Sequence, residues 1–193
     1  MVSLELKELI NSDIYRYSGG IKNFTPRILW SRKEIALYYS IVLRKAHYYT
    51  LSGSKLRSLY YRYKLNKLMR KFLIQIPYPV EIGAGFCMVH FGRIVMAPAV
   101  KIGRNCNVFT GVTIGSTVRG KNAGVPTIGN EVWIGPNAVL VGNIKIGDDV
   151  LIAGNSYVNF DVPDHSIVIG NPGEIVAKDN ATQGYITSKW KAE

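Results

Sequence analysis

Aliphatic side chains return every six residues between Ile82 and Val168, and a glycine or another small residue usually follows them. This spacing does not fit a helix, which repeats every 3.6 residues. A six-residue period is typical of a parallel β-helix, in which three short strands direct aliphatic residues inward and close a coil of about eighteen residues. Glycine is expected to allow the turns. The repeat has three phases: Ile82, Met88 and Ile94; then Ile102, Val108 and Ile114; then Ile128, Ile134, Leu140, Ile146, Ile152 and Val158.

A polar, glycine-rich segment, residues 116–127, interrupts the repeat. A segment of this composition cannot fill a coil, so we expect a protruding loop. Loops on a rigid scaffold commonly carry binding residues. Arg119 and Lys121 at its tip suit a ligand that bears phosphate groups. A tolerated insertion is the alternative interpretation.

The N-terminal part of the chain has a helical pattern. We expect a short first helix around residues 4–10, broken at 18–20, an amphipathic helix over 27–49, and a third helix that follows residues 52–54 and is ended by Pro77 and Pro79. The chain therefore divides into three parts. These are a helical segment (1–77), a β-helix domain (78–178) with the loop 116–127, and a polar C-terminal tail (179–193) that is expected to be loose.

The formal net charge of +11 lies entirely in the helical segment. Residues 1–77 hold fifteen Lys or Arg against four acids, whereas residues 78–193 hold nine of each. Ten of the twelve tyrosines lie at or before position 78. Basic and aromatic residues together favour a surface that docks on an anionic membrane leaflet. A helical cap on the β-helix with a solvated basic face is the other open interpretation. Nucleic acid is not expected, because no binding motif accompanies the charge.

Cysteine usage and hydropathy exclude several classes. Two cysteines are too few for a disulfide framework and have no metal-ligand spacing, so we expect a reducing compartment and no metal. Neither a signal peptide nor a run of about eighteen apolar residues is recognisable. We therefore expect a cytoplasmic protein, with any membrane contact peripheral.

Four segments resemble the hexapeptide-repeat acyltransferases, and within them the serine O-acetyltransferase branch. They are residues 88–95, 111–115, 162–164 and 170–172, and the resemblance covers about residues 75 to 178. It implies a mainly β protein with a left-handed parallel β-helix, acetyl-CoA as co-substrate, and a homotrimer with each active site between two subunits.

His90 carries the predicted chemistry. It is the only one of three histidines inside the repeat, and the resemblance places it at the family's catalytic base. An ordinary imidazole titrates near pH 6.5, so a neutral fraction can take a proton from an acceptor hydroxyl, which then attacks the thioester. Gln75 stands where the family has a carboxylate that orients the histidine, and its amide oxygen is expected to accept a hydrogen bond from the imidazole.

The resemblance also implies where the donor lies. The CoA arm is expected along the outside of the β-helix near Gly115, Gly135 and Ala153, with Lys178 as a candidate partner of a CoA phosphate.

Two departures bear on the acceptor. Val89 stands where serine enzymes have Asp, and Gly124-Val125 stand where they have Arg-His. These losses remove partners for the ammonium and carboxylate of an amino acid. The short basic N-terminal segment resembles acetyltransferases of capsule and exopolysaccharide biosynthesis. We therefore predict acetyl transfer to a sugar hydroxyl, carried on a membrane lipid, in surface polysaccharide assembly. L-Serine O-acetylation for cysteine synthesis and a non-catalytic β-helix scaffold are the alternatives.

Overall fold

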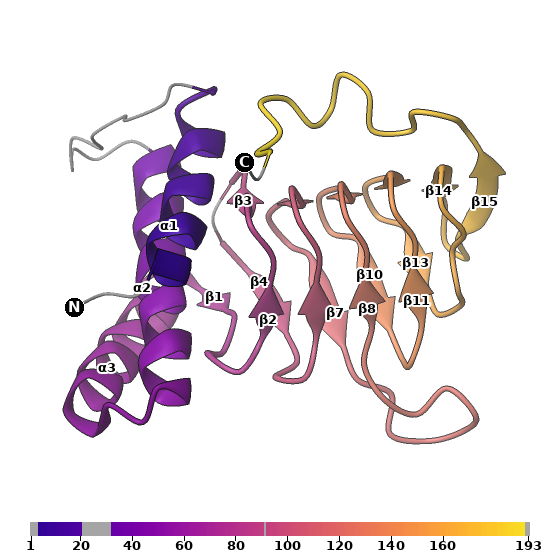
Figure 1. Cartoon of the computed structure of the whole chain (residues 1–193). Helices are drawn as coiled ribbons and strands as arrows, with labels where there is room; N and C mark the ends of the chain where they lie inside the picture. Colours follow the sequence, from indigo (N-terminus) through magenta and orange to yellow (C-terminus); the bar gives the residue numbers. More distant parts are fainter. Residues whose placement is uncertain (1–3, 21–31, 91, 192–193) are drawn as a thin grey trace.

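The computed structural model describes residues 4–20, 32–90 and 92–191. Three helices come first and a parallel β-helix follows, so the predicted class, mainly β with a short helical segment, is confirmed (Figure 1). The helices are α1 (Leu4–Tyr17), α2 (Arg32–Leu51) and α3 (Lys55–Phe72). The strands are β1 (Ile74–Gln75), β2 (Glu81–Ile82), β3 (Cys87–Met88), β4 (Ile94–Met96), β5 (Lys101–Ile102), β6 (Asn107–Val108), β7 (Thr113–Gly115), β8 (Thr127–Ile128), β9 (Trp133–Ile134), β10 (Val139–Val141), β11 (Lys145–Ile146), β12 (Val150–Ile152), β13 (Tyr157–Val158), β14 (Ser166–Ile169) and β15 (Glu174–Ala177).

The three expected helices are present, with different bounds. The predicted start of α2, residues 27–31, lies outside the described residues. The expectation that Pro77 and Pro79 end α3 is wrong. The helix already ends at Phe72, because Leu73 takes a left-handed conformation with φ 55°. The chain then enters β1 directly, so the first coil begins before the predicted start at Ile82.

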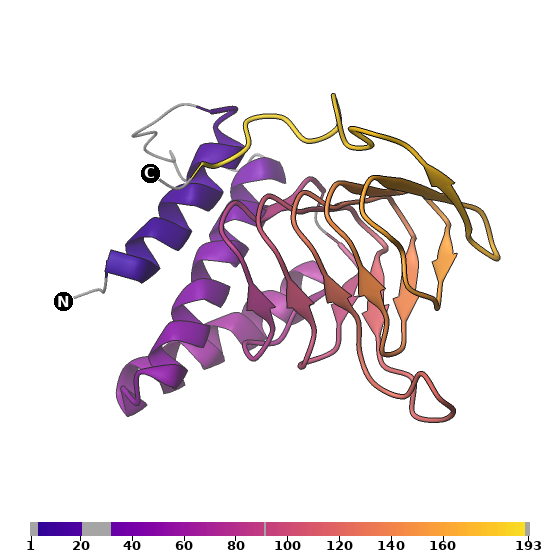
Figure 2. The ribbon, with the colours of Figure 1, turned by 45° about the vertical axis from the view of Figure 1, so that its right-hand side comes forward.

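The β-helix is a three-sided prism, and each face is a sheet of parallel strands from successive coils (Figure 2). One face stacks β1, β4, β7, β10 and β13; the second stacks β2, β5, β8 and β11; the third stacks β3, β6, β9, β12 and β14, and β15 closes it in antiparallel pairing with β14. The repeat residues point inward as predicted. Ile94, Val108 and Ile134, for example, are fully buried.

Glycines on the second face serve close approach of the coils. A Cβ on Gly83 would lie 2.7 Å from the carbonyl carbon of Gly103, and one on Gly129 would lie 2.7 Å from that of Gly147. None of these glycines has a positive φ. The expectation that they permit the turn is therefore wrong for this face. Only glycine lets consecutive coils approach this closely.

Side chains of the helices cap the open edge of the first coil on all three faces. The Tyr39 hydroxyl donates to the carbonyl of Ile74 in β1. The Arg44 guanidinium donates to the carbonyls of Ile82 and Gly83 beside β2. On β3, the hydroxyl of Tyr17 accepts from the Met88 N–H at 2.8 Å and contacts the Met88 carbonyl oxygen at 3.2 Å. An exposed edge is a template for unwanted pairing, so the helices protect the β-helix at this end.

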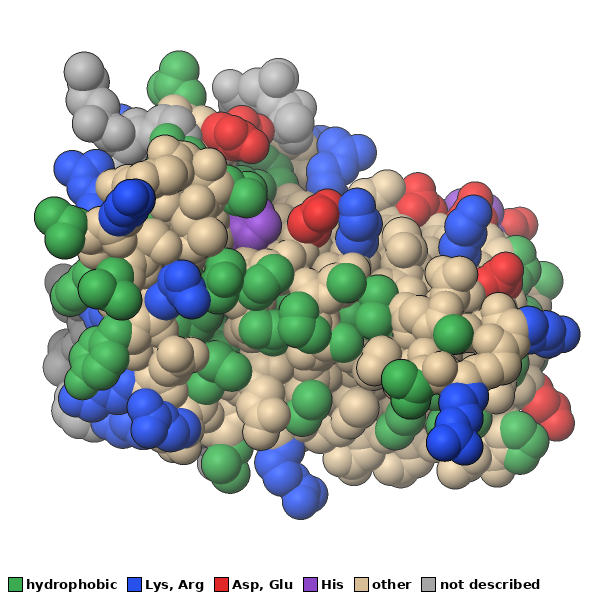
Figure 3. All heavy atoms as spheres, turned by 90° about the horizontal axis from the view of Figure 1, so that it is seen from below, with side chains coloured by type: hydrophobic (Ala, Val, Ile, Leu, Met, Phe, Trp, Pro, Cys, Tyr) green, Lys and Arg blue, Asp and Glu red, His purple; other side chains and the backbone are tan. Residues whose placement is uncertain are grey.

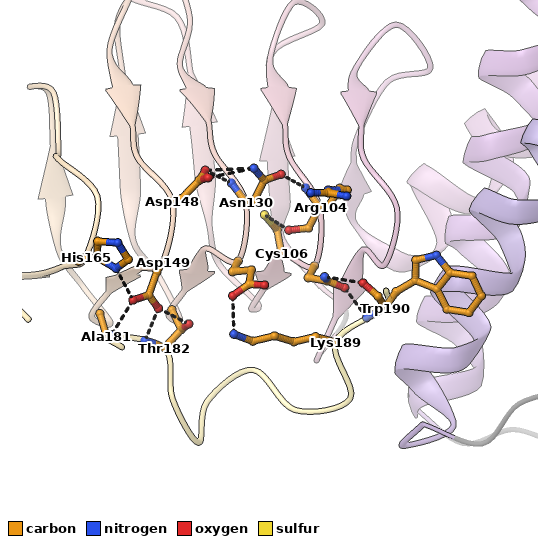
Figure 4. Close-up of polar contacts among 12 residues, drawn as sticks. Arg104, Cys106, Asn130, Asp148, Asp149, His165, Ala181, Thr182, Lys189 and Trp190 are labelled. Carbon is orange, nitrogen blue, oxygen red and sulfur yellow. Dashed lines mark hydrogen bonds and ion pairs between the residues drawn. The ribbon is translucent and has the colours of Figure 1, made fainter. Parts of the chain in front are cut away.

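Residues 178–191, here called the C-terminal strap, run back along the β-helix toward α1, and they are not the loose tail that their composition predicts (Figures 2 and 4). The anchors are three left-handed residues on successive coils: Asn105, Glu131 and Asp149. Asn105 exchanges hydrogen bonds with the backbone of Trp190, Glu131 pairs with Lys189, and Asp149 accepts from the N–H groups of Ala181 and Thr182.

The clamp at Asp149 is expected to depend on pH. The hydrogen bond to Asp149, 2.9 Å from His165 Nδ1, raises the pKa of His165. Burial pushes the pKa of Asp149 up, but the hydrogen bonds from His165, Thr182 and Ala181 together lower it. Because the pKa of His165 is raised in the folded protein, its contact with Asp149 contributes fully below the ordinary histidine pKa, and this contribution is lost as pH rises through the raised pKa. Because the pKa of Asp149 is lowered, the contacts of its carboxylate contribute fully above the ordinary aspartate pKa, and they are lost as pH falls through the lowered pKa.

We therefore expect the strap to be held best between about pH 4 and about pH 6.5. Limited proteolysis of the strap should quicken from pH 6 to pH 9, after correction for the protease's own pH profile with an unstructured peptide. His165→Gln keeps a donor for Asp149 but does not titrate, so its cleavage rate should stay flat. Equal pH dependence in both proteins would contradict the expectation.

Candidate active site

His90 lies just beyond β3, at the corner where the chain turns toward β4, and its side chain is exposed. The backbone before it is held by Tyr17, whose hydroxyl accepts from Met88 N–H. The backbone after it is held by the next coil, because the carbonyl of Gly92 accepts from Thr110 Oγ1 at 2.7 Å and from Gly111 N–H at 3.2 Å. An imidazole is thus presented to solvent from a turn that is tied on both sides.

The turn itself requires two left-handed residues, Gly92 with φ 114° and Arg93 with φ 45°. Glycine adopts such a φ without steric cost, whereas a side chain at this position would be strained. The glycine two residues after His90 therefore serves the sharp turn that leaves the imidazole outside the prism.

An aromatic row begins at His90 and follows the third face. The ring of His90 contacts that of Phe109 edge-on, with centroids 5.8 Å apart. The ring centroids of Phe109 and Trp133 are 4.7 Å apart, and those of Trp133 and Tyr185 of the strap are 5.2 Å apart. Phe109 and Trp133 are half-buried. Phe109 thus limits the directions in which the imidazole can turn, and the strap contributes to the surface that continues from it.

The predicted contact between Gln75 and His90 is not seen among the described residues. Gln75 lies in β1 on the first face, where it pairs with Val95 of β4, whereas His90 follows β3 on the third face. The side chain of Gln75 is exposed and lines a cavity of about 440 Å³ against α3, together with Asn66, Met69, Arg70 and Leu73. An orienting role for Gln75 stays a prediction.

The residues expected along the CoA arm lie on two faces. Gly135 and Ala153 follow the paired strands β9 and β12 on the third face, so they are neighbours on successive coils. Gly115 ends β7 on the first face, beside Val141. Lys178 is exposed after β15, and its N–H donates to the carbonyl of His165. Within one chain these positions do not form a single groove.

The expected loop protrudes between β7 and β8, at the lower right of Figure 1. Thr117 and Gly124 exchange two backbone hydrogen bonds at its base, of 3.0 and 2.9 Å. Arg119 and Lys121 at the tip are exposed, which keeps them available to an anionic ligand. A Cβ on Gly124, which has φ 137°, would lie 2.8 Å from Cβ of Asn143, so the fold excludes larger residues there.

In the part of the chain that the structure describes, no group of three or more His, Cys, Asp or Glu side chains could hold a metal ion.

Sequence reasoning missed Phe109 and Thr110. The signal was available, because Met88 pairs with Val108 in the next coil, and the same offset of twenty residues, continued beyond both strands, leads from His90 to the segment that contains Phe109 and Thr110. A register of twenty residues across this coil would have identified both.

The comparisons with known proteins agree with this geometry. Residues 126–159 match the family model described as bacterial transferase hexapeptide (six repeats). The serine acetyltransferase of Bacillus pumilus strain SAFR-032 is 32% identical over 150 residues, which span 74% of this chain and 69% of that protein. The one from Helicobacter pylori strain ATCC 700392 is 30% identical over 148 residues, 76% of this chain and 86% of the relative. The crystal structure of the Neisseria gonorrhoeae serine acetyltransferase in complex with serine has a TM-score of 0.73 at 27% identity, over 90% of this chain and 69% of that one.

These findings overturn the predicted acceptor. The expectation of a sugar hydroxyl in surface polysaccharide assembly is wrong, because the relatives and the structural neighbour are serine acetyltransferases. The error came from giving Val89 and Gly124-Val125 more weight than the similarity of the remaining chain. The position of Gly124 shows a physical reason for one departure, since the loop has no space for the arginine of the serine enzymes.

Proposed function

Since this chain belongs to the hexapeptide-repeat acyltransferases, in their serine acetyltransferase branch, we propose that it transfers the acetyl group of acetyl-CoA to the hydroxyl of L-serine. The similarity across three quarters of the chain carries this proposal. The exposed imidazole of His90 on its tied turn supports it, because an acyltransferase needs an accessible base at a fixed position.

His90 acts as the general base in this proposal. Its imidazole accepts the proton of the serine hydroxyl while the hydroxyl oxygen attacks the thioester carbonyl carbon. The carbon–sulfur bond then breaks, O-acetylserine forms, and the imidazolium returns the proton to the departing CoA sulfur. The contact with Phe109 favours this exchange, because a ring held against one neighbour keeps its free nitrogen directed at the reacting groups.

The donor and the assembly are proposed on the same basis. On the third face Ala153 is half-buried and presents only a methyl group, whereas Gly135 is buried against the ring of Trp133. Arg119, Lys121 and Lys178 supply positive charge for the phosphates of CoA. Because Gly115 lies on another face, the donor groove becomes continuous only between neighbouring subunits. A homotrimer is therefore part of the proposal. The cytoplasm is proposed as its compartment because two cysteines without a disulfide framework suit reducing conditions.

Thiol release from acetyl-CoA tests the reaction. We expect release that depends on L-serine and is absent with L-alanine, which has the same ammonium and carboxylate but no hydroxyl. Release that is equal in the two reactions, or absent from both, would overturn the proposal for serine.

The departure at Val89 leads to a gain-of-function prediction. Val89→Asp places a carboxylate directly before His90, where a charge-assisted hydrogen bond to the ammonium of serine contributes about 1.5–3 kcal/mol. The KM for L-serine should fall by about 10- to 100-fold. Val89→Asn is the matched control, because it has nearly the same shape without the charge, and it should change KM little. Equal effects of the two variants would show that charge at this position does not select the acceptor.

A further inference from the structure

The outward face of α3 combines exposed apolar side chains with positive charge. Leu56, Leu59, Tyr60 and Tyr63 are 85%, 67%, 55% and 63% exposed. Their spacing of three and four residues places them on one stripe of the helix. The opposite stripe, with Leu65 and Leu68, is buried against the rest of the protein. The outward face therefore contributes nothing to the core.

All charged side chains of α3 are basic. The helix carries Lys55, Arg57, Arg62, Lys64, Lys67, Arg70 and Lys71 and no Asp or Glu. Lys67 and Arg70 are exposed and continue the apolar stripe by helical spacing. Figure 3 shows hydrophobic side chains beside Lys and Arg over this helical end of the molecule. Exposed leucines flanked by cations are the pattern of a helix that lies in the interface of an anionic membrane.

Aromatic rings accompany several of these cations. Lys64 lies 5.1 Å from the ring centroid of Tyr38 and 5.7 Å from that of Tyr60. The hydrogen bond with Tyr38 raises the pKa of Lys64, which favours the charged form of this side chain further. The side chains of Tyr60 and Tyr63 are exposed, and tyrosine is enriched at the level of the lipid headgroups in proteins that contact membranes.

We propose that the outward face of α3 is a docking surface for an anionic lipid bilayer. Charge complementarity selects this occupant. A second copy of the chain would bring together two α3 helices that carry seven cations each and no acids, and like charges repel. None of the described helices is long and apolar enough to cross a membrane. The leucines enter the headgroup boundary, and the cations bind lipid phosphates around them.

Vesicle co-sedimentation of the full chain tests the proposal. We expect binding to vesicles of equal parts phosphatidylglycerol and phosphatidylcholine, little binding to phosphatidylcholine alone, and release as NaCl rises from about 0.05 to about 0.5 M. Leu56→Ser/Leu59→Ser should weaken partition at least about tenfold. Lys67→Gln/Arg70→Gln should weaken it about 25-fold, at about fivefold for each cation.

The control is Val118→Ser/Lys145→Gln, which removes one exposed apolar side chain and one exposed cation far along the chain from α3. It should leave partition unchanged. All substituted residues are exposed, and circular dichroism should confirm that the variants fold. Absence of vesicle binding would overturn the proposal. Equal binding by all variants would also overturn it. A lower oligomer mass of the leucine variant without a change in its partition would overturn it as well, and would assign the outward face of α3 to a second copy of the chain.

Discussion

His90→Ala is expected to lower kcat for acetyl transfer by about 10² to 10⁴, the range that a positioned general base contributes. Among the described residues, the substitution removes the one titratable side chain that this turn presents to solvent as an acceptor of the hydroxyl proton. Folding should not change, because the side chain is exposed and its neighbours Met88 and Gly92 are held through backbone and Tyr17 or Thr110 contacts. Thiol release with saturating L-serine measures the loss, and thermal unfolding checks the fold.

His165→Gln is the matched control for this experiment. It also removes an exposed imidazole, but one that binds Asp149 at the strap. Its turnover at saturating substrate should equal that of the wild type. Turnover by His90→Ala within a factor of about three of the control would rule out His90 as the base and assign it a positioning role.

Asp13→Ala is expected to lower the free energy of unfolding by about 3–5 kcal/mol, the cost of leaving a buried charge without its partner. Asp13 is fully buried and Arg44 is 6% exposed. The carboxylate accepts from Arg44 Nε at 3.1 Å, Arg44 Nη2 at 3.0 Å and the Phe86 N–H at 2.9 Å, and also from Ser40. Its loss also loosens the guanidinium that caps the edge of β2, so helices and β-helix lose contact together.

Lys101→Ala provides the comparison, because Lys101 pairs with Glu81 at 3.3 Å while both side chains are more than half exposed. An exposed pair contributes about 0–1 kcal/mol. Urea unfolding of both variants measures the difference. If Asp13→Ala lowers the free energy of unfolding no more than Lys101→Ala does, solvent must reach the pair of Asp13 and Arg44 and screen it.

The core of the β-helix was predictable from sequence because each coil repeats one local rule. A residue such as Ile134 must be aliphatic wherever the strand turns its side chain inward, and that requirement recurs at a fixed spacing. The early start of the first coil was missed because it lies at the boundary between the helical segment and the β-helix. There Leu73 ends α3 in a left-handed conformation that no local sequence pattern marks.

The contacts that join distant parts of the chain were not predictable in the same way. Trp190 binds Asn105 across 85 residues of sequence, and neither residue belongs to a periodic pattern. The row from His90 through Phe109 and Trp133 depends on the register between coils, and the offset changes from twenty residues between Met88 and Val108 to twenty-six between Val108 and Ile134, so no single period reveals the row. His90 itself was found from its motif. Gln75 was expected near His90 because both belong to the first coil, but the two residues lie on different faces of that coil.

The path of the C-terminal strap has a consequence for the way the molecule unfolds. A solenoid normally loses coils one by one from either end, because each coil contacts only its neighbours. Here the last described residues return to the first coils, and the ring of Trp190 contacts that of Tyr15 in α1 edge-on, with centroids 5.4 Å apart. Fraying at either end therefore requires breaking the contact between Trp190 and α1, so we expect the helices and the β-helix to unfold in one cooperative step. The same closure joins the two extremes of the sequence, and such high contact order slows folding.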